Sequence, residues 1–219
     1  MDNGHLSIEG HVVVEPGEEF ETAGLVFKVN GAPWEFHEKA FLMLHKPANF
    51  ECSQKPATYP SIYSLLPAPL RQRPSKSAVA GVQAIGRLDA DTTGMLLLSD
   101  DGTFIHKMSS PKHHVPKVYE VSTKHTVTAA QVARLVDGVV LDDDPRPVRA
   151  AQCEATGEQS LRLVLTEGKY HQVKRMIAAV GNRVETLHRS RIGQLELTPD
   201  LAPGQWRWLR DADLAALKA

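Results

Sequence analysis

The sequence is poor in cysteine and has no long apolar run. Only two of its 219 residues are cysteines, Cys52 and Cys153, and they lie far apart without a Cys-x-x-Cys pair. Such cysteines are typical of reduced thiols, so we expect a cytoplasmic protein without disulfides. No apolar run reaches the ~18 residues that a membrane span needs. The N-terminus lacks the basic start and apolar stretch of a signal peptide, so we expect neither a membrane anchor nor secretion.

Motifs for metal binding and nucleotide hydrolysis are also missing. The chain has ten histidines, but His113 and His114 are adjacent, and no His-x-x-x-His or Cys-x-x-Cys spacing occurs. Gly168 and Lys169 lack the upstream glycine and the following Ser or Thr of a phosphate-binding loop. We therefore expect no metal ion and no nucleotide hydrolysis.

Charge is distributed unevenly along the chain. The net charge is −1, but residues 169–191 hold six Lys or Arg against one acid, a local charge of +5, so the remaining residues carry −6. Residues 1–35 alone contain seven acids and one base, Lys28. This asymmetry is typical of a basic face on an acidic protein and is compatible with RNA binding. An ordinary solvated charged face is the common alternative, and charge alone does not decide between them.

The apolar pattern predicts more strands than helices. Strands are predicted at residues 5–8, 11–14, 25–29, 40–44, 95–99, 118–123, 160–166, 184–192, 195–198 and 206–209. Helices are predicted at residues 61–66, 103–108, 128–138 (opened by a Thr-x-x-Gln capping box), 170–180 (closed by Gly181) and at the C-terminus. A break near residues 31–38 predicts a boundary between a small N-terminal part and the rest. Short turns between many strands favour a mixed, largely antiparallel α+β fold.

The most informative stretch, residues 84–102, combines a charged turn with a buried run. It places the carboxylate of Asp89 close to Arg87 at the edge of a turn, and the apolar residues 95–98 follow. A second acidic turn, residues 100–102, ends that run. A turn fixed between buried strands is a rigid support for a reactive side chain, so this segment is the first candidate for chemistry.

The order Gly-Arg-Leu-Asp-x-x-Thr-x-Gly-x-Leu-Leu-Leu in this stretch resembles the central motif of the pseudouridine synthases. From residue 42 onward the chain is similar to the RsuA-type branch, which modifies 16S rRNA of the bacterial small ribosomal subunit. The similarity lies in blocks at residues 45–47, 86–102, 110–121, 167–181, 187–193 and 201–204. The resemblance implies a pseudouridine synthase fold with a central mixed, mostly antiparallel sheet flanked by helices and loops. It also implies isomerisation of uridine, in which uracil is detached, rotated and rejoined through carbon without a cofactor.

The resemblance also implies roles for individual residues. Asp89 matches the essential catalytic aspartate, and Tyr119 in Lys117-Val118-Tyr119 matches a tyrosine that contacts the target uracil. Lys174 matches a basic residue placed against the aspartate, with Arg175 in reserve. From the residues alone, Tyr119 is a core tyrosine on an alternating strand, and the basic residues form a solvated helix face.

Further residues are expected to contact RNA. Basic residues that surround the catalytic motifs, or that lie on the strand at residues 187–193, are suited to phosphate contacts. These RNA-binding candidates are Arg87, Lys117, His171, Gln172, Arg175, Arg189 and Arg191. The expected partner is 16S rRNA or a partly assembled small subunit, bound by a monomer.

The N-terminal part departs from the family pattern. We expect residues 1–36 to be a remnant of an RNA-binding module shared with a ribosomal protein, and residues 39–219 to be the catalytic domain. Only the later strand portion of that module is matched, without its two helices, so either the chain is truncated or this half was lost. The acidic charge there argues against RNA binding by this part alone, and we expect weaker substrate affinity than in a full-length relative.

Three alternatives stay open at this point. One is a pseudouridine synthase acting on large-subunit (23S) rRNA. A second is a magnesium phosphatase, because residues 89–93 fit Asp-x-Asp-x-Thr, although that chemistry follows an apolar parallel strand. A third is an RNA-binding relative that has lost catalysis, which the joint presence of Asp89, Tyr119 and Lys174 argues against.

Overall fold

The structure, a computed structural model, describes residues 6–15, 17–74, 80–142 and 144–217. The chain divides into two compact units, Met1–Ala40 and Phe41–Ala219. Residue 5 of the first predicted strand lies outside the described residues. Among the described helices, none has the length and apolar character to cross a bilayer.

The N-terminal unit is a small antiparallel sheet of four strands in the order β2-β1-β3-β4. These strands are β1 (Leu6–Ile8), β2 (His11–Val12), β3 (Val26–Val29) and β4 (Ala32–Glu35). The segment at residues 31–38, where a boundary is predicted, contains β4, and before it Asn30 and Gly31 form a hairpin turn with φ values of 50° and 81°. Asn-Gly is favoured in two-residue hairpin turns, where both residues need a positive φ. Pro33 is tolerated in β4 because β4 is an edge strand.

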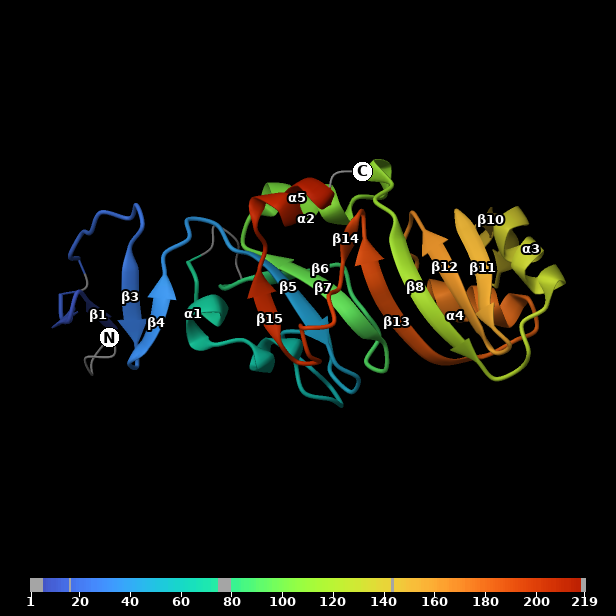
Figure 1. Cartoon of the computed structure of the whole chain (residues 1–219), viewed down its shortest axis with the longest axis horizontal. Coiled ribbons are helices and arrows are strands. Elements are labelled where there is room, and N and C mark those ends of the chain that lie inside the picture. Colours follow the sequence, from blue (N-terminus) through green and yellow to red (C-terminus); the bar gives the residue numbers. More distant parts are fainter. Residues whose placement is uncertain (1–5, 16, 75–79, 143, 218–219) are drawn as a thin grey trace. The chain divides into compact units, whose positions relative to one another are not determined.

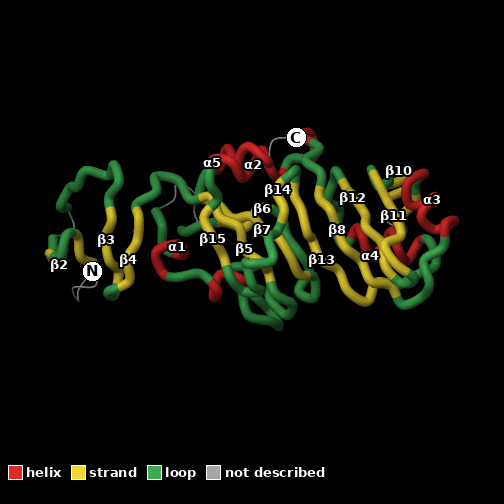
Figure 2. The backbone as a smooth tube through the Cα atoms, in the orientation of Figure 1, coloured by secondary structure: helices red, strands yellow, loops and turns green. Residues whose placement is uncertain are grey.

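The larger unit is built on one sheet of nine strands (Figures 1 and 2). Along the main path of this sheet the strands are β11 (Gln152–Gly157), β12 (Ser160–Leu165), β8 (Lys117–Thr123), β13 (Val184–Ile192), β7 (Thr93–Ser99), β5 (Phe41–Lys46) and β15 (Trp206–Trp208). In addition, β14 (Leu195–Glu196) pairs with β13 and β6 (Gln83–Ile85) pairs with β7. Strands β7 and β13 are parallel and the other pairs are antiparallel. The predicted mixed, mostly antiparallel α+β fold is confirmed.

Short helices flank this sheet. They are α1 (Ala68–Arg71), α2 (Gly102–Ser109), α3 (Ala129–Asp137), α4 (Gln172–Ala179) and α5 (Asp211–Ala216), with 3-10 turns at Ile62–Leu65 and Pro111–His113. The predicted capping box is present, because the Thr128 and Gln131 side chains each accept a bond from the other's backbone N–H. A separate hairpin, β9 (Val139–Leu141) with β10 (Asp144–Val148), follows α3 and was not predicted.

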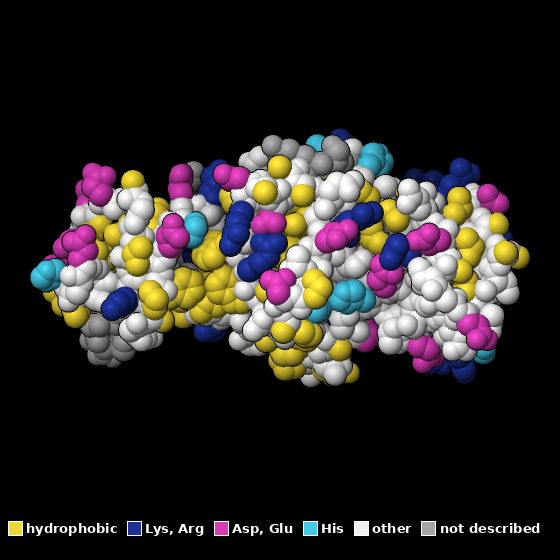
Figure 3. Space-filling model, viewed as in Figure 1, with side chains coloured by type: hydrophobic (Ala, Val, Ile, Leu, Met, Phe, Trp, Pro, Cys, Tyr) yellow, Lys and Arg dark blue, Asp and Glu magenta, His cyan; other side chains and the backbone are white. Residues whose placement is uncertain are grey.

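Two clusters of buried side chains fix the elements around the site. One joins α4 to β8, β12 and β13, and the apolar face of α4 enters it through Val173, Met176 and Ile177. The other packs α2 and α5 against β5 and β7. Charged side chains on the sheet pair locally, as Arg162 does with Glu120 at 2.9 Å and Glu154 at 3.0 Å. On the face drawn in Figure 3, basic and acidic side chains are interspersed without a large area of one sign.

Candidate active site

The turn that carries Asp89 links β6 to β7. The backbone N–H of Thr92 donates to the Asp89 carbonyl at 3.1 Å and closes the turn. Gly94, just after the turn, has φ +110°, and a Cβ there would lie 2.3 Å from the backbone oxygen of Arg189. The motif glycine therefore permits the close parallel contact of β7 with β13.

The side chain of a buried lysine holds this turn through hydrogen bonds to backbone carbonyls. Lys46 is fully buried at the end of β5, and its Nζ donates to the carbonyls of Pro47, Ala90 and Thr92 at 2.9–3.0 Å. Burial lowers the pKa of Lys46, while the nearby Asp91 and Asp89 carboxylates oppose that shift. Sequence reasoning missed this role, and the signal was a lysine at the end of an apolar strand.

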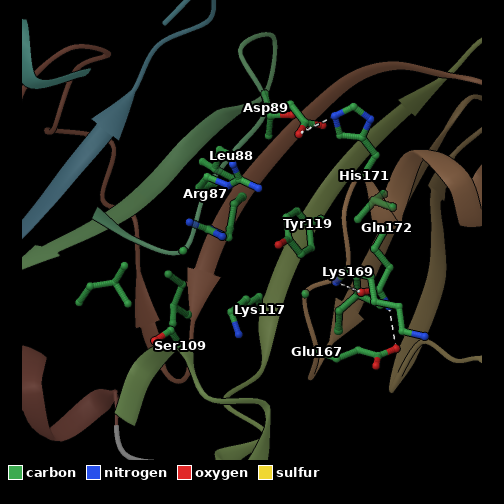
Figure 4. A pocket seen from close by; sticks show the side chains of 18 of the residues that line it. Arg87, Leu88, Asp89, Ser109, Lys117, Tyr119, Glu167, Lys169, His171 and Gln172 are labelled. Carbon is green, nitrogen blue, oxygen red and sulfur yellow. Dashed lines mark hydrogen bonds and ion pairs between the residues drawn. The ribbon is translucent and has the colours of Figure 1, made fainter. Parts of the chain in front are cut away.

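The Asp89 carboxylate is shared by two basic side chains. Its Oδ2 lies 3.0 Å from Lys174 Nζ, and its Oδ1 lies 3.2 Å from His171 Nε2. Figure 4 shows Asp89 and His171 pointing toward one another. Both partners come from the start of α4, where His171 adopts a left-handed backbone with φ 47° and thereby precedes the helix. This is why α4 begins at Gln172, two residues after the predicted start.

A second carboxylate also binds Lys174. The Nζ of Lys174 donates to both carboxylate oxygens of Asp91, at 2.7 and 2.9 Å. Burial lowers the pKa of Lys174, but the bonds to Asp91 and Asp89 outweigh it and raise that pKa overall. Burial likewise opposes ionisation of Asp91, yet the bond to Lys174 lowers its pKa overall. Lys174 therefore stays protonated beside Asp89.

Asp89 opens onto a cavity of about 230 Å³. The cavity is lined on one side by Tyr119 from β8, which is 8% exposed. In the view of Figure 4, Tyr119 lies between Asp89 and Lys117. Lys117 Nζ donates to the Val115 carbonyl at 3.0 Å. Burial, with the nearby charge of Arg189, lowers the pKa of Lys117 to about 8.

Arg189 is part of the cavity wall rather than of the protein surface. Its side chain is buried at 3% exposure, and its Nε donates to the Met95 carbonyl at 2.8 Å. Its Nη2 is buried and has no hydrogen-bond partner among the described residues. Such a donor is costly to leave unpaired inside a protein.

The other expected RNA contacts differ in their placement. Arg87, His171 and Gln172 line the cavity, whereas Arg175 and Arg191 do not. Gln172 is buried and braces the loop before α4: its Nε2 donates to Glu167 and its Oε1 accepts from the Lys169 N–H, both at 2.8 Å (Figure 4). Arg189 is buried, so it does not offer the surface phosphate contact that was expected of it. Arg191, paired in register with Val118, has its Nη1 3.9 Å from Glu196, and its contact with RNA stays a prediction.

The arrangement also bears on metal chemistry. No group of three His, Cys, Asp or Glu side chains in the described part of the chain is placed to hold a metal ion. Asp89 follows β6, which is antiparallel to β7, and not the parallel strand that the phosphatase alternative requires. The fold and the site together define a cavity that carries the Asp89 carboxylate beside Lys174 and His171, with the donors Lys117 and Arg189 in its wall.

Comparison with known proteins identifies the family. Residues 40–179 match the model of the RNA pseudouridylate synthase family, and the chain belongs to this family. It is 40% identical over 179 residues to ribosomal small subunit pseudouridine synthase A of Yersinia pestis, covering 82% of this chain and 73% of the relative. The protein of the same name from Pasteurella multocida is 37% identical over 213 residues, covering 97% and 86%.

A solved structure agrees with this assignment. A crystal structure of a pseudouridylate synthase superposes with a TM-score of 0.74 at 33% identity, covering 98% of this chain and 89% of that one. The family and the fold that the motifs predicted are thus confirmed.

Proposed function

We propose that the protein isomerises a specific uridine to pseudouridine in 16S rRNA of the small ribosomal subunit. The observation that carries the proposal is the Asp89 carboxylate, held by Lys174 and His171 at the mouth of the cavity. The names of the relatives supply the RNA class, since those proteins are small-subunit pseudouridine synthases.

The chemistry follows from the atoms that must move. The bond between the ribose and the uracil nitrogen breaks, the base rotates, and a bond to carbon forms. A proton leaves that carbon, and the released nitrogen takes up a proton. No atom or electron is gained overall, so the reaction is an isomerisation. Asp89 acts at the ribose, either as a nucleophile or as a base, and both routes begin with its carboxylate. Lys174 and His171 orient that carboxylate through contacts of 3.0 and 3.2 Å.

The cavity wall supplies recognition of the base. The Tyr119 ring offers a face on which uracil stacks, worth roughly 1–3 kcal/mol. Lys117 and Arg189 can only donate hydrogen bonds, and uracil presents carbonyl oxygens that accept them. Cytosine has an amino group in place of one carbonyl, which these donors disfavour.

Basic side chains near the cavity supply the contacts with the RNA backbone outside the target base. A uridine must leave its stack to enter the cavity, at a cost of a few kcal/mol. Phosphate contacts from the exposed Arg87 and from Lys169 and Arg175 offset that cost. We propose residues 1–36 as the strand portion of a ribosomal-protein-like module, and a cytoplasmic monomer acting on free 16S rRNA or a partly assembled small subunit. The acidic charge of residues 1–35 leaves RNA binding to the larger unit.

The test is to map pseudouridine after incubation with unmodified 16S rRNA, free and in partly assembled small subunits. Carbodiimide-stop primer extension reports each new pseudouridine as a stop. We expect one new stop with the natural protein and none with Asp89→Asn, which keeps the size of the side chain but removes its charge. RNA affinity of the variant should stay within a few-fold. Turnover by Asp89→Asn would remove this residue from its role, and a stop only in 23S rRNA would overturn the assigned substrate.

A further inference from the structure

The most exposed aromatic side chain beside the site is Tyr170. Its exposure is 69%, and no other described large hydrophobic side chain is more exposed. Tyr170 does not line the cavity. Apolar rings are usually withdrawn from water, so a ring displayed at the rim of a nucleic-acid site needs an explanation.

The ring of Tyr170 is fixed in position by its neighbour. It stacks on the His171 ring with centroids 3.7 Å apart and planes inclined by 22°. The left-handed backbone of His171 accompanies this stacking, and non-glycine residues hold such a conformation where the surroundings or the function require it. The Arg175 guanidinium donates to the Tyr170 carbonyl at 3.1 Å and ties the segment to α4. The ring is therefore presented without the entropy cost that a freely rotating side chain would carry.

The stacked rings of Tyr170 and His171 lie next to the Asp89 carboxylate. One face of the His171 ring is covered by Tyr170, while His171 Nε2 reaches Asp89 Oδ1 at 3.2 Å. With one face on His171 and most of its surface exposed, Tyr170 offers its other face at the rim of the cavity. The cations Lys169, Lys174 and Arg175 lie within five residues of it in the sequence. An aromatic platform among cations is the pattern by which proteins hold unpaired bases of single-stranded nucleic acid.

We propose that Tyr170 is a stacking subsite for the unpaired base next to the target uridine. This rests on the proposed function, because it takes the bound ligand to be RNA. When the target uridine leaves its stack to reach Asp89, its neighbour loses a stacking partner. The Tyr170 ring replaces that partner and holds the flanking nucleotide while the target occupies the cavity.

The experiment measures coupling between this ring and the flanking base. Binding is measured in the Asp89→Asn background with an RNA fragment that contains the mapped target uridine. Two further fragments carry an abasic nucleotide on its 5′ or its 3′ side. We expect Tyr170→Ala to raise the Kd about 5- to 150-fold and Tyr170→Phe to leave it nearly unchanged. With Tyr170 present, one of the two abasic RNAs should bind with a similarly raised Kd. For that RNA, Tyr170→Ala should raise the Kd little further.

Controls separate this role from support of His171. Tyr59→Ala removes another exposed tyrosine, 41% exposed on a different loop, and should leave the Kd unchanged. In a chain with Asp89 intact, the single-turnover rate of Tyr170→Ala at saturating RNA is measured beside its Kd. A slower rate with an unchanged Kd would overturn the stacking subsite. So would binding free energies in which the effect of Tyr170→Ala and the effect of the missing base simply add for both abasic RNAs. If the natural protein forms no pseudouridine at all, it is the proposed function that fails.

Discussion

Lys117 places an ammonium group in the cavity wall near a second cation, Arg189. Burial lowers its pKa to about 8, whereas an unfolded lysine keeps its ordinary, higher value. Lys117 is therefore charged at neutral pH and loses its charge as the pH rises through about 8. If its ammonium binds a uracil carbonyl, kcat/KM declines above that pH.

We expect Lys117→Met to lower kcat/KM at neutral pH by about tenfold to a hundredfold, the worth of a hydrogen bond from a charged donor. The variant should also lose the decline near pH 8. Because the unfolded state binds more protons, the natural protein gains stability as the pH rises through the folded pKa of Lys117, and this gain should vanish too. A pH series of kcat/KM and of denaturant unfolding measures both. A decline that persists in the variant would assign the titration to another group.

At the same scale, the candidate residues of the site could be named from the sequence more readily than the residues that support them. Asp89, Tyr119 and Lys174 lie in contiguous motifs that can be recognised without a fold. The roles of Lys46 and Arg189 depend on burial, which arises only when β5, β7 and β13 come together. A surface phosphate contact was the natural interpretation of a cation on a strand, because a sequence does not show which face of the strand is covered.

At the scale of elements, Gly94 fixes the contact between β7 and β13. Any Cβ there would overlap the Arg189 backbone, and the positive φ adds strain. We expect Gly94→Ala to lower the free energy of unfolding by about 3 kcal/mol or more, since the backbone has to shift. Gly102→Ala is the matched control, because Gly102 starts α2, has no positive φ and has no atom within 4 Å of its Cβ position. The control should be neutral or slightly stabilising in denaturant unfolding. Equal stability of the two variants would contradict the packing argument.

Strands with strong apolar patterns were predicted well, and weakly patterned ones were missed. The predicted strand at residues 184–192 is β13 with the same bounds. Strand β11 was missed because its residues are mostly exposed and polar. Strand β10 contains two prolines, which argue against a strand in any sequence-based scheme. These strands form because a neighbouring strand is available for backbone hydrogen bonds. The residues of each strand alone do not show that such a partner exists.

At the scale of the whole molecule, folding disperses the basic segment 169–191. Three of its six cations are buried or lie near a carboxylate: Arg189 is buried, Arg183 lies 3.5 Å from Glu185, and Arg191 lies 3.9 Å from Glu196. A fourth, Lys174, is held by two aspartates. The cations that we propose to contact phosphate are Lys169 and Arg175 of this segment, together with Arg87 from the aspartate turn. We therefore expect fewer phosphate contacts from this segment than its local charge of +5 suggests.

This dispersal predicts a shallow dependence of RNA binding on salt. With about three phosphate contacts on single-stranded RNA, log K should fall against log salt concentration with a slope of about −2, whereas all six cations would give about −4. Lys169→Gln should reduce the slope by about 0.7, while Arg183→Gln, which removes a cation already paired with Glu185, should leave it unchanged. Titrations of a 16S fragment over a series of salt concentrations measure all three slopes. A steep slope that Arg183→Gln reduces as much as Lys169→Gln would mean that the RNA follows the whole basic segment rather than the mouth of the cavity.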